Sequence, residues 1–341
     1  RLMRLLCRVG FNASPPTTHP TEAQLYREAA RRSGVQAFDE MESLKGGGDM
    51  SGGGSVVSSE QACPALIKAY CAKATDCMPF NQALGFPDAA TCEARLNLTC
   101  PQLAKAMGTS VTGDDLQACS AKFSSISCYD YLSLSNPVQV CDFKPGKLTD
   151  GSACGEGVQC QSLYCKKDST MDCGKCTALG KSGSVCVTNS DCDKGLACVG
   201  AAGAKQCTAY LTMGASCSTA ANSPSCHPTL ACRNGVCATP AKLGESCSAT
   251  TQDCDKLSGL TCPLALKCVG YATAQLGGAC GQQGSTYVLC AGGSWCDSTS
   301  KKCMAPAPDG IACSDATGPK CQAPANCRAG ICKIADSATC M

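Results

Sequence analysis

The stretch Cys186-Val-Thr-Asn-Ser-Asp-Cys192-Asp-Lys-Gly-Leu-Ala-Cys198 decides the fold class, because its cysteine spacing returns throughout the second half of the chain. A fourth cysteine, Cys207, completes this copy. Successive copies begin 30 to 33 residues apart, with almost no linker between them. The chain therefore contains an array of six short modules, whose first cysteines are Cys154, Cys186, Cys217, Cys247, Cys280 and Cys313.

Each module has a glycine three residues before its first cysteine. A glycine at a fixed offset from a cross-link usually supplies a turn with φ > 0, or a close backbone approach where a Cβ would clash. Asn234-Gly235, in the third module, favours a tight hairpin turn. We therefore expect a loop and a short β-hairpin in each module, with structural glycines at Gly151, Gly183, Gly214, Gly244, Gly277 and Gly310.

A module of about 32 residues is shorter than the ~40 residues at which a chain usually buries enough surface to fold unaided. Disulfides must supply the missing stability, each about 3 kcal/mol for a ~15-residue loop. Four cysteines allow three connectivities. Among them we favour the one that joins the first cysteine to the third and the second to the fourth.

Cysteine makes up 35 of the 341 residues, a density at which a disulfide scaffold is the expected class. Free thiols in such number would oxidise or scramble, and reducing compartments hold such sets together mainly with metal. Zinc would need repeated Cys-x-x-Cys pairs, and the chain has one, Cys173-Gly-Lys-Cys176. We therefore expect disulfides and an extracellular or cell-surface location.

Two short motifs could carry chemistry. Cys173-Gly-Lys-Cys176 has the form of a redox pair, but it lacks the strand-helix context that activates such a thiol. We expect one of its cysteines to fill the fourth position of the first module. Asn189, Asp191 and Asp193 alternate like the start of a calcium loop that lacks its distal acidic ligand, so we favour turn capping and predict no metal and no cofactor.

Composition argues against several other functions. Charged residues make up 16% of the chain and the net charge is +2, so no basic excess is available for nucleic acid. The two histidines, His19 and His227, lie far apart in sequence, which removes the usual parts of Ser/His and Cys/His catalysis. No stretch approaches the ~20 apolar residues of a membrane span. We therefore predict a protein that is not an enzyme, does not bind nucleic acid and has no membrane span.

Residues 59–145 carry eight cysteines on helical patterns. Asp88 can cap one helix, Thr112 with Asp115 can begin a second, and Pro101 can start a shorter one. We expect a small helical bundle whose inward-facing cysteines are paired. A helix over 63–77 would bury one face, formed by Cys63, Leu66, Ile67, Tyr70, Cys71 and Ala74.

Residues 1–58 differ from the rest, because they hold a single cysteine, Cys7. Thr21 and Gln24 form a capping pair for a helix of about three turns, and the glycine-rich run 46–54 is typical of a flexible connector. This segment is an arm that cannot bury a core alone. The predicted fold is a small disulfide-rich multidomain chain with an arm (1–58), a disulfide-crosslinked helical domain (59–145) and six repeats (146–341).

The second module, with Cys186, Cys192, Cys198 and Cys207, resembles the N-terminal cysteine-rich domain of Dickkopf proteins and related repeats of secreted bacterial proteins, notably of myxobacterial type. The resemblance covers residues 148–340. It implies a secreted, disulfide-rich module that contacts other proteins. The signalling-antagonist role of animal Dickkopfs is not implied, because the companion domain and its spacing are missing.

An odd number of cysteines leaves at least one without a partner in its own chain. Eight fit the helical domain and twenty-four the modules, so the extra cysteines are Cys7, Cys340 and one of Cys173 or Cys176. Two of these could pair within one subunit, and a leftover cysteine in a secreted protein points to a bond between chains. We hypothesise that Cys7 is crosslinked to Cys340, or to another exposed cysteine, of a neighbouring subunit. Apolar side chains of the arm would dock there: Leu2, Leu5, Leu6, Val9 and Phe11.

These patterns predict a secreted, non-enzymatic structural protein that self-assembles through its arm into an extracellular filament or matrix. Its partners would be copies of itself, in a homo-oligomer or polymer, and other extracellular proteins or glycans. Repeat arrays also offer long binding surfaces. The alternative is therefore a cell-surface adhesion or ligand-binding protein.

Overall fold

The computed structural model describes residues 57–134, 137–167, 171–201, 203–220, 223–284, 286–336 and 340. The arm, with its expected helix and glycine-rich connector, lies outside these residues. The same holds for the docking side chains proposed within it, Leu2, Leu5, Leu6, Cys7, Val9 and Phe11.

Helices form the first part of the described chain, and residues 57–143 are called the helical unit below. Side-chain caps start the helices where the sequence predicted them. Asp88 accepts a hydrogen bond from the Thr91 N–H, and Thr112 forms a capping box with Asp115. The helices are α3 (Ser59–Cys77), α4 (Pro79–Gly85), α5 (Ala89–Asn97), α6 (Gln102–Lys105), α7 (Gly113–Ser125) and α8 (Cys128–Leu132), followed by the 3₁₀ helix η1 (Pro137–Val140).

The helical unit has an apolar core between α3 and α7. Tyr70 packs edge-on against Phe123 with ring centroids 5.5 Å apart, and Phe123 is fully buried. The predicted face of α3 is buried at all six positions, which confirms the helical pattern. Four disulfides cross this core, namely Cys63–Cys100, Cys71–Cys92, Cys77–Cys128 and Cys119–Cys141.

Six small modules follow, and they are numbered 1 to 6 by their cysteine quartets, which span 154–176, 186–207, 217–237, 247–268, 280–303 and 313–332. In every module the first cysteine bonds the third and the second bonds the fourth, which confirms the favoured connectivity. Cys176 fills the fourth position of module 1.

The strands of the modules are short. They are β1 (Ala153–Cys154), β2 (Cys165–Lys166), β3 (Gly174–Cys176), β4 (Leu196–Val199), β5 (Gln206–Ala209), β6 (Ala231–Arg233), β7 (Val236–Ala238), β8 (Leu260–Thr261), β9 (Val269–Gly270), β10 (Ala272–Ala274), β11 (Gly281–Gln283), β12 (Thr286–Cys290), β13 (Trp295–Cys296), β14 (Cys303–Met304), β15 (Asn326–Arg328) and β16 (Ile331–Lys333). Short 3₁₀ helices η2 (Gly157–Gln159), η3 (Asn189–Asp191) and η4 (Lys256–Ser258) lie between them.

One backbone pattern recurs in all six modules. The residue before the first cysteine pairs antiparallel with the residue before the fourth, as Val185 does with Gln206. The N–H of the preceding glycine donates to the carbonyl of the fourth cysteine at 2.7 to 2.9 Å. Each of these glycines has φ between +80° and +89°, and an added Cβ would meet no atom within 4 Å. The backbone conformation, and not crowding, therefore requires glycine here.

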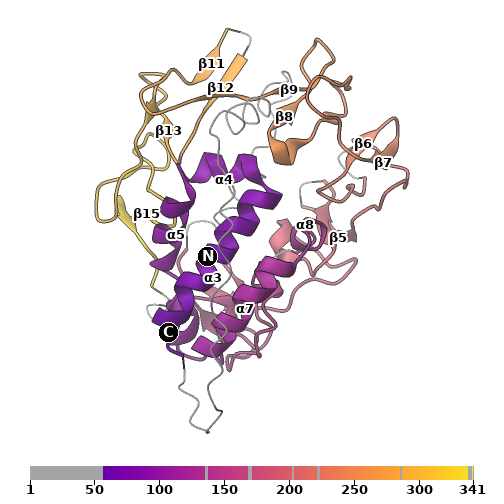
Figure 1. Cartoon of the computed structure of the whole chain (residues 1–341). Coiled ribbons are helices and arrows are strands. Elements are labelled where there is room, and N and C mark those ends of the chain that lie inside the picture. Colours follow the sequence, from indigo (N-terminus) through magenta and orange to yellow (C-terminus); the bar gives the residue numbers. More distant parts are fainter. Residues whose placement is uncertain are drawn as a thin grey trace, which may run out of the picture.

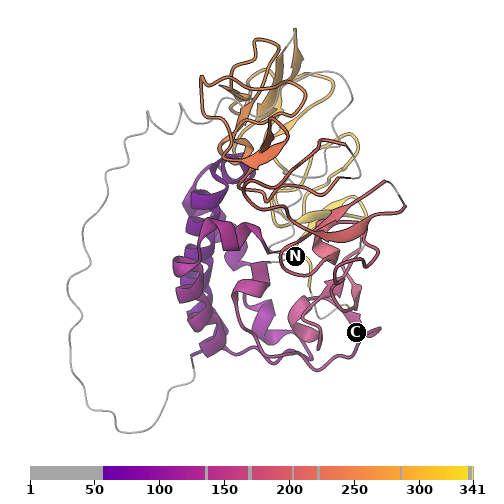
Figure 2. The same ribbon diagram turned by 90° about the vertical axis from the view of Figure 1, so that its right-hand side faces the viewer.

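The modules pack against the helices and do not form a free array. Figure 1 shows them framing α3, α5 and α7, and Figure 2 shows that most of them lie to one side of the helices. A disulfide between Cys173 and Cys340 joins module 1 to the end of the chain, 167 residues later, and Arg328 pairs with Asp172 beside it at 2.8 Å. The modules therefore form a covalently closed ring, which we call the module ring.

Candidate functional site

The module ring is positioned by contacts that tie its members to the helical unit. Gly292 and Gly293 of module 5 donate their N–H groups to the carbonyls of Ala83 and Leu84 near the end of α4, at 2.9 and 2.7 Å. A Cβ on Gly293 would lie 2.8 Å from the carbonyl oxygen of Gly85. A helix end leaves its last carbonyls without intrahelical donors. Module 5 therefore supplies donors that α4 lacks.

Arg95 of α5 anchors module 6. Its guanidinium makes two bonds of 2.8 Å to the carboxylate of Asp309, and its Nε donates to the carbonyl of Ala323 at 2.8 Å. Planar guanidinium groups favour this two-pronged geometry. Module 1 is held by Gln159, whose amide donates to the carbonyl of Met107 at 2.7 Å. The helical unit thus fixes the ring at several points.

In modules 2 and 4 the residue that precedes the second cysteine contacts the module before it. In module 2, Asp191 accepts from the N–H groups of Val187 and Thr188 at 2.9 Å and from the hydroxyl of Tyr164, in module 1, at 2.8 Å. Burial raises the pKa of Asp191, but these hydrogen bonds and the charge of Lys166 outweigh it and lower the pKa below its usual value. Asp191 is therefore a turn cap and a link between modules.

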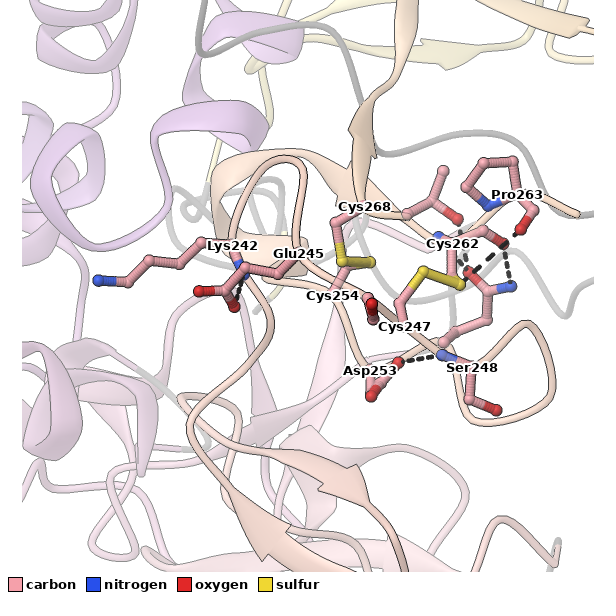
Figure 3. Close-up of a disulfide and its surroundings, with 12 residues drawn as sticks. Lys242, Glu245, Cys247, Ser248, Asp253, Cys254, Cys262, Pro263 and Cys268 are labelled. Atoms are coloured by element: carbon pink, nitrogen blue, oxygen red, sulfur yellow. Dashed lines mark hydrogen bonds between the residues drawn. A yellow bond between two sulfur atoms is a disulfide. The ribbon is translucent and has the colours of Figure 1, made fainter. Parts of the chain in front are cut away.

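Module 4 repeats the turn cap and the link, and Figure 3 shows the cap formed by Asp253 on Ser248. Asp253 accepts from the N–H of Ser248 at 2.7 Å, and Arg233 of module 3 lies 3.2 Å from its carboxylate. The disulfides Cys247–Cys262 and Cys254–Cys268 occupy the centre of the module. In modules 1 to 5 three cysteine sulfurs lie within 4.8 Å of one another. All of them are bonded in disulfides, so they offer no thiolate to a metal.

The modules of the ring carry most of the exposed apolar side chains among the described residues. Among the described residues, thirteen of the sixteen large apolar side chains that are exposed lie in the modules, and the other three are Leu98, Met107 and Tyr129. An exposed apolar surface on a folded protein commonly marks a contact with another molecule. The ring is therefore the best candidate for a binding surface.

Module 4 exposes four of these side chains, which we call the module 4 surface. Leu264 is 81% exposed, Leu266 51%, Leu243 49% and Val269 41%. Leu264 and Leu266 lie in the turn between β8 and β9, and Val269 begins β9. Leu243 lies near the other end of the hairpin, because the N–H of the next residue, Gly244, donates to the carbonyl of Cys268. The buried cluster of this module consists of two disulfides with Ala241 and Leu260, and the four exposed side chains lie outside it.

A Ser–His pair also occurs where the ring meets the helices. The Oγ of Ser133 lies 2.9 Å from Nε2 of His227, but the N–H of Thr229 donates to Nδ1 of the same ring at 3.3 Å. Nδ1 is therefore the acceptor, and Nε2 carries the hydrogen. A general base would need Nε2 free to take the serine proton. Because Nε2 donates a hydrogen to Ser133 instead, this pair is not arranged as a nucleophile and its base.

The sequence-predicted site residues fall into two groups. In each module the first cysteine is in a disulfide, and the glycine three residues before it forms the turn with positive φ described above. The intersubunit hypothesis for Cys340 is contradicted, because its sulfur is bonded to Cys173 of the same chain. The structure takes the other alternative, in which two of the spare cysteines pair within one subunit. The count of cysteines allowed this pair but could not choose it. With the other 34 cysteines paired in 17 disulfides, none is left within the chain for Cys7.

Sequence reasoning missed the residues that join the ring to the helices. Gly292 and Gly293 had a visible signal, since a double glycine stands outside the module pattern. The pair of Arg95 and Asp309 has no signal in the sequence, because the two residues lie 214 positions apart. The sequence assigned His227 no role, because its distance from His19 argued only against Ser/His and Cys/His catalysis.

Comparison with known proteins gives one informative match. The chain is 29% identical over 143 residues to cell-cell adhesion glycoprotein 64 of Heterostelium pallidum, and the match covers 40% of this chain and 41% of that protein. No protein-family model and no solved structure matches. The resemblance to Dickkopf repeats therefore stays a prediction from cysteine spacing.

The disulfides and this relative indicate an extracellular or cell-surface protein. None of the described helices has both the length and the apolar character needed to cross a bilayer.

Proposed function

We propose that this chain is a non-enzymatic adhesion protein whose module ring binds a partner on another cell surface. The observation that carries the proposal is the concentration of exposed apolar side chains on the ring. The relative is named a cell-cell adhesion glycoprotein, which supports the same reading. The partner would be a protein or a glycan with an apolar face, since the exposed groups on module 4 are leucine and valine.

Adhesion of beads coated with the oxidised full chain, to one another and to cells of the source organism, tests this proposal. Leu264→Ser with Leu266→Ser should weaken adhesion at least tenfold, because burying a leucine contributes about 1.5–3 kcal/mol and ~1.4 kcal/mol is tenfold in affinity. Met107→Ser in the helical unit, 68% exposed, is the matched control. Equal adhesion of both variants and the wild type would contradict the proposal.

We keep self-association through the arm as a second proposal, because Cys7 has no cysteine of its own chain left to bond. The bond would then join Cys7 of two copies. Electrophoresis without reductant should show a disulfide-linked dimer that is lost in Cys7→Ser. A monomeric band with Cys7 as a free thiol would rule this out and leave the adhesion proposal untouched.

A further inference from the structure

His227 lies at a junction of three parts of the molecule. It belongs to module 3 and is 1% exposed. The ring of Tyr129, on α8 of the helical unit, stacks on it with centroids 3.7 Å apart, and Tyr210 of the segment after β5 meets it edge-on at 5.5 Å. Module 3 is therefore held against α8 through a buried titratable side chain.

The hydrogen bonds around this imidazole suit its neutral form. Nδ1 accepts from the N–H of Thr229 at 3.3 Å and lies 2.8 Å from the Thr229 hydroxyl. Nε2–H donates to the hydroxyl of Ser133, which in turn donates to the carbonyl of Tyr129 at 2.9 Å. Both ring nitrogens are thus satisfied without a charge, and the tautomer follows from the network.

A second proton would disturb this arrangement. It would add at Nδ1, where the Thr229 hydroxyl, 2.8 Å away, can accept the new hydrogen, but the N–H of Thr229, at 3.3 Å, would lose its acceptor. It would also place a charge in a buried site. Burial lowers the pKa of His227 below its usual value, and the carbonyl of Tyr129 and the charge of Asp130 oppose that shift only in part. The titratable or charged groups that face the imidazole are Tyr129 and Asp130 of α8 and Tyr210.

We propose that His227 makes the attachment of module 3 to the helical unit acid-sensitive, so that uptake of a proton releases the module from α8. The attached state holds the neutral ring, whereas the released state exposes His227 to solvent and binds the proton more tightly. The attachment is therefore fully stable above about pH 6.5, the ordinary histidine value, and weakens as the pH falls below it. This inference does not depend on what the ring binds.

The test uses the oxidised full chain carrying His19→Gln, so that His227 is the one remaining histidine. Nitrogen NMR should show the Nε2–H tautomer at pH 7.5 and a titration below the ordinary histidine value. Amide exchange should be corrected for its intrinsic pH dependence. In residues 223–238 it should then rise about tenfold for each unit that the pH falls below the pKa of His227 in the released state. Exchange in α3 should not change. Unchanged exchange in module 3 at pH 4.5 would overturn the proposal.

Two variants separate protonation from packing. His227→Phe keeps an aromatic ring against Tyr129 but cannot titrate, so the pH dependence of exchange in module 3 should vanish whatever its absolute level. Asp130→Asn removes the carboxylate that favours the cation and should move the titration of His227 to lower pH. A pH dependence that survives in His227→Phe, or a midpoint unmoved in Asp130→Asn, would contradict the assignment.

Discussion

The helical unit and the modules are both rich in disulfides, but the cross-links have different parts in the two regions. In the helical unit they lie in a core of large side chains that includes Tyr70, Leu96 and Phe123. In module 1 the buried cluster is the four cysteines themselves, with Leu148 against them. The difference shows that disulfides reinforce a core in the first region and replace one in the second.

Chain length explains this difference. A module of about 30 residues cannot remove enough apolar surface from water to offset the entropy of folding. Cross-linking lowers the entropy of the unfolded state instead. The apolar side chains that such a module cannot bury stay on its surface, which is why most of the exposed apolar side chains among the described residues lie on the ring.

Removing one disulfide from each region should give the largest contrast. Cys254→Ala with Cys268→Ala should abolish amide protection throughout module 4, because losing about 2–5 kcal/mol exceeds what the rest of a module can supply. Cys71→Ala with Cys92→Ala should leave α3 protected by its apolar core. Hydrogen exchange with mass spectrometry measures both. A module 4 that stays protected would mean that its other contacts suffice to fold it.

Phe123→Ala is expected to destabilise the helical unit by about 3–5 kcal/mol, because it leaves a cavity beneath Tyr70. Chemical denaturation without reductant, followed by helical circular dichroism, measures the loss. The hairpins of the modules should keep their amide protection in this variant. If the modules unfolded together with α3, the two regions would be one cooperative unit.

Arg95→Met should loosen the joint between the two regions by about 2 kcal/mol, because it removes charge-assisted bonds to Asp309 and to the carbonyl of Ala323. Exchange in residues 309–325 should rise accordingly. Lys73→Met is the control, since its Nζ lies 3.9 Å from the exposed carboxylate of Asp76, beyond hydrogen-bond distance, and such a pair contributes less than about 1 kcal/mol. Equal effects of both variants would show that Arg95 does not hold module 6.

Gly183→Ala should have the smallest effect, about 1 kcal/mol, because alanine at φ +85° is strained even though its Cβ would have space. Thermal unfolding of module 2 measures the change. Ser182→Ala, at the exposed neighbouring position, should stay within about 0.5 kcal/mol. An alanine tolerated at Gly183 as well as at Ser182 would show that the turn can adopt another conformation.

Local features of the fold were predictable from the sequence. Asp88 and Thr112 cap their helices through bonds to residues three positions later, so capping depends only on neighbours in the chain. Two short helices were missed although their signals are present. Pro79 stands at the start of α4, and Ser127 with Asp130 caps α8. Their length of 7 and 5 residues leaves too little periodicity to reveal them.

The sequence predicted the type of surface that could bind a partner, but not where on the molecule it lies. Cysteine density and repeats indicated an extracellular protein with a long surface, and the recurring offsets gave the modules. Only the structure shows where the exposed apolar side chains lie. In the sequence, Leu243 and Val269 cannot be distinguished from a leucine or valine that is buried. His227 is buried because Tyr129, 98 positions earlier in the chain, stacks on it. No pattern within one module could predict that contact.

The sequence alone determined each module, because its disulfides join cysteines 11 to 16 residues apart and its turn depends on one glycine at a fixed offset. The tertiary structure alone decided that the modules close into a ring that packs against the helices. The bond between Cys173 and Cys340 and the pair of Arg95 with Asp309 join residues that only the folded chain brings together, since their contact depends on the summed geometry of all the modules between them.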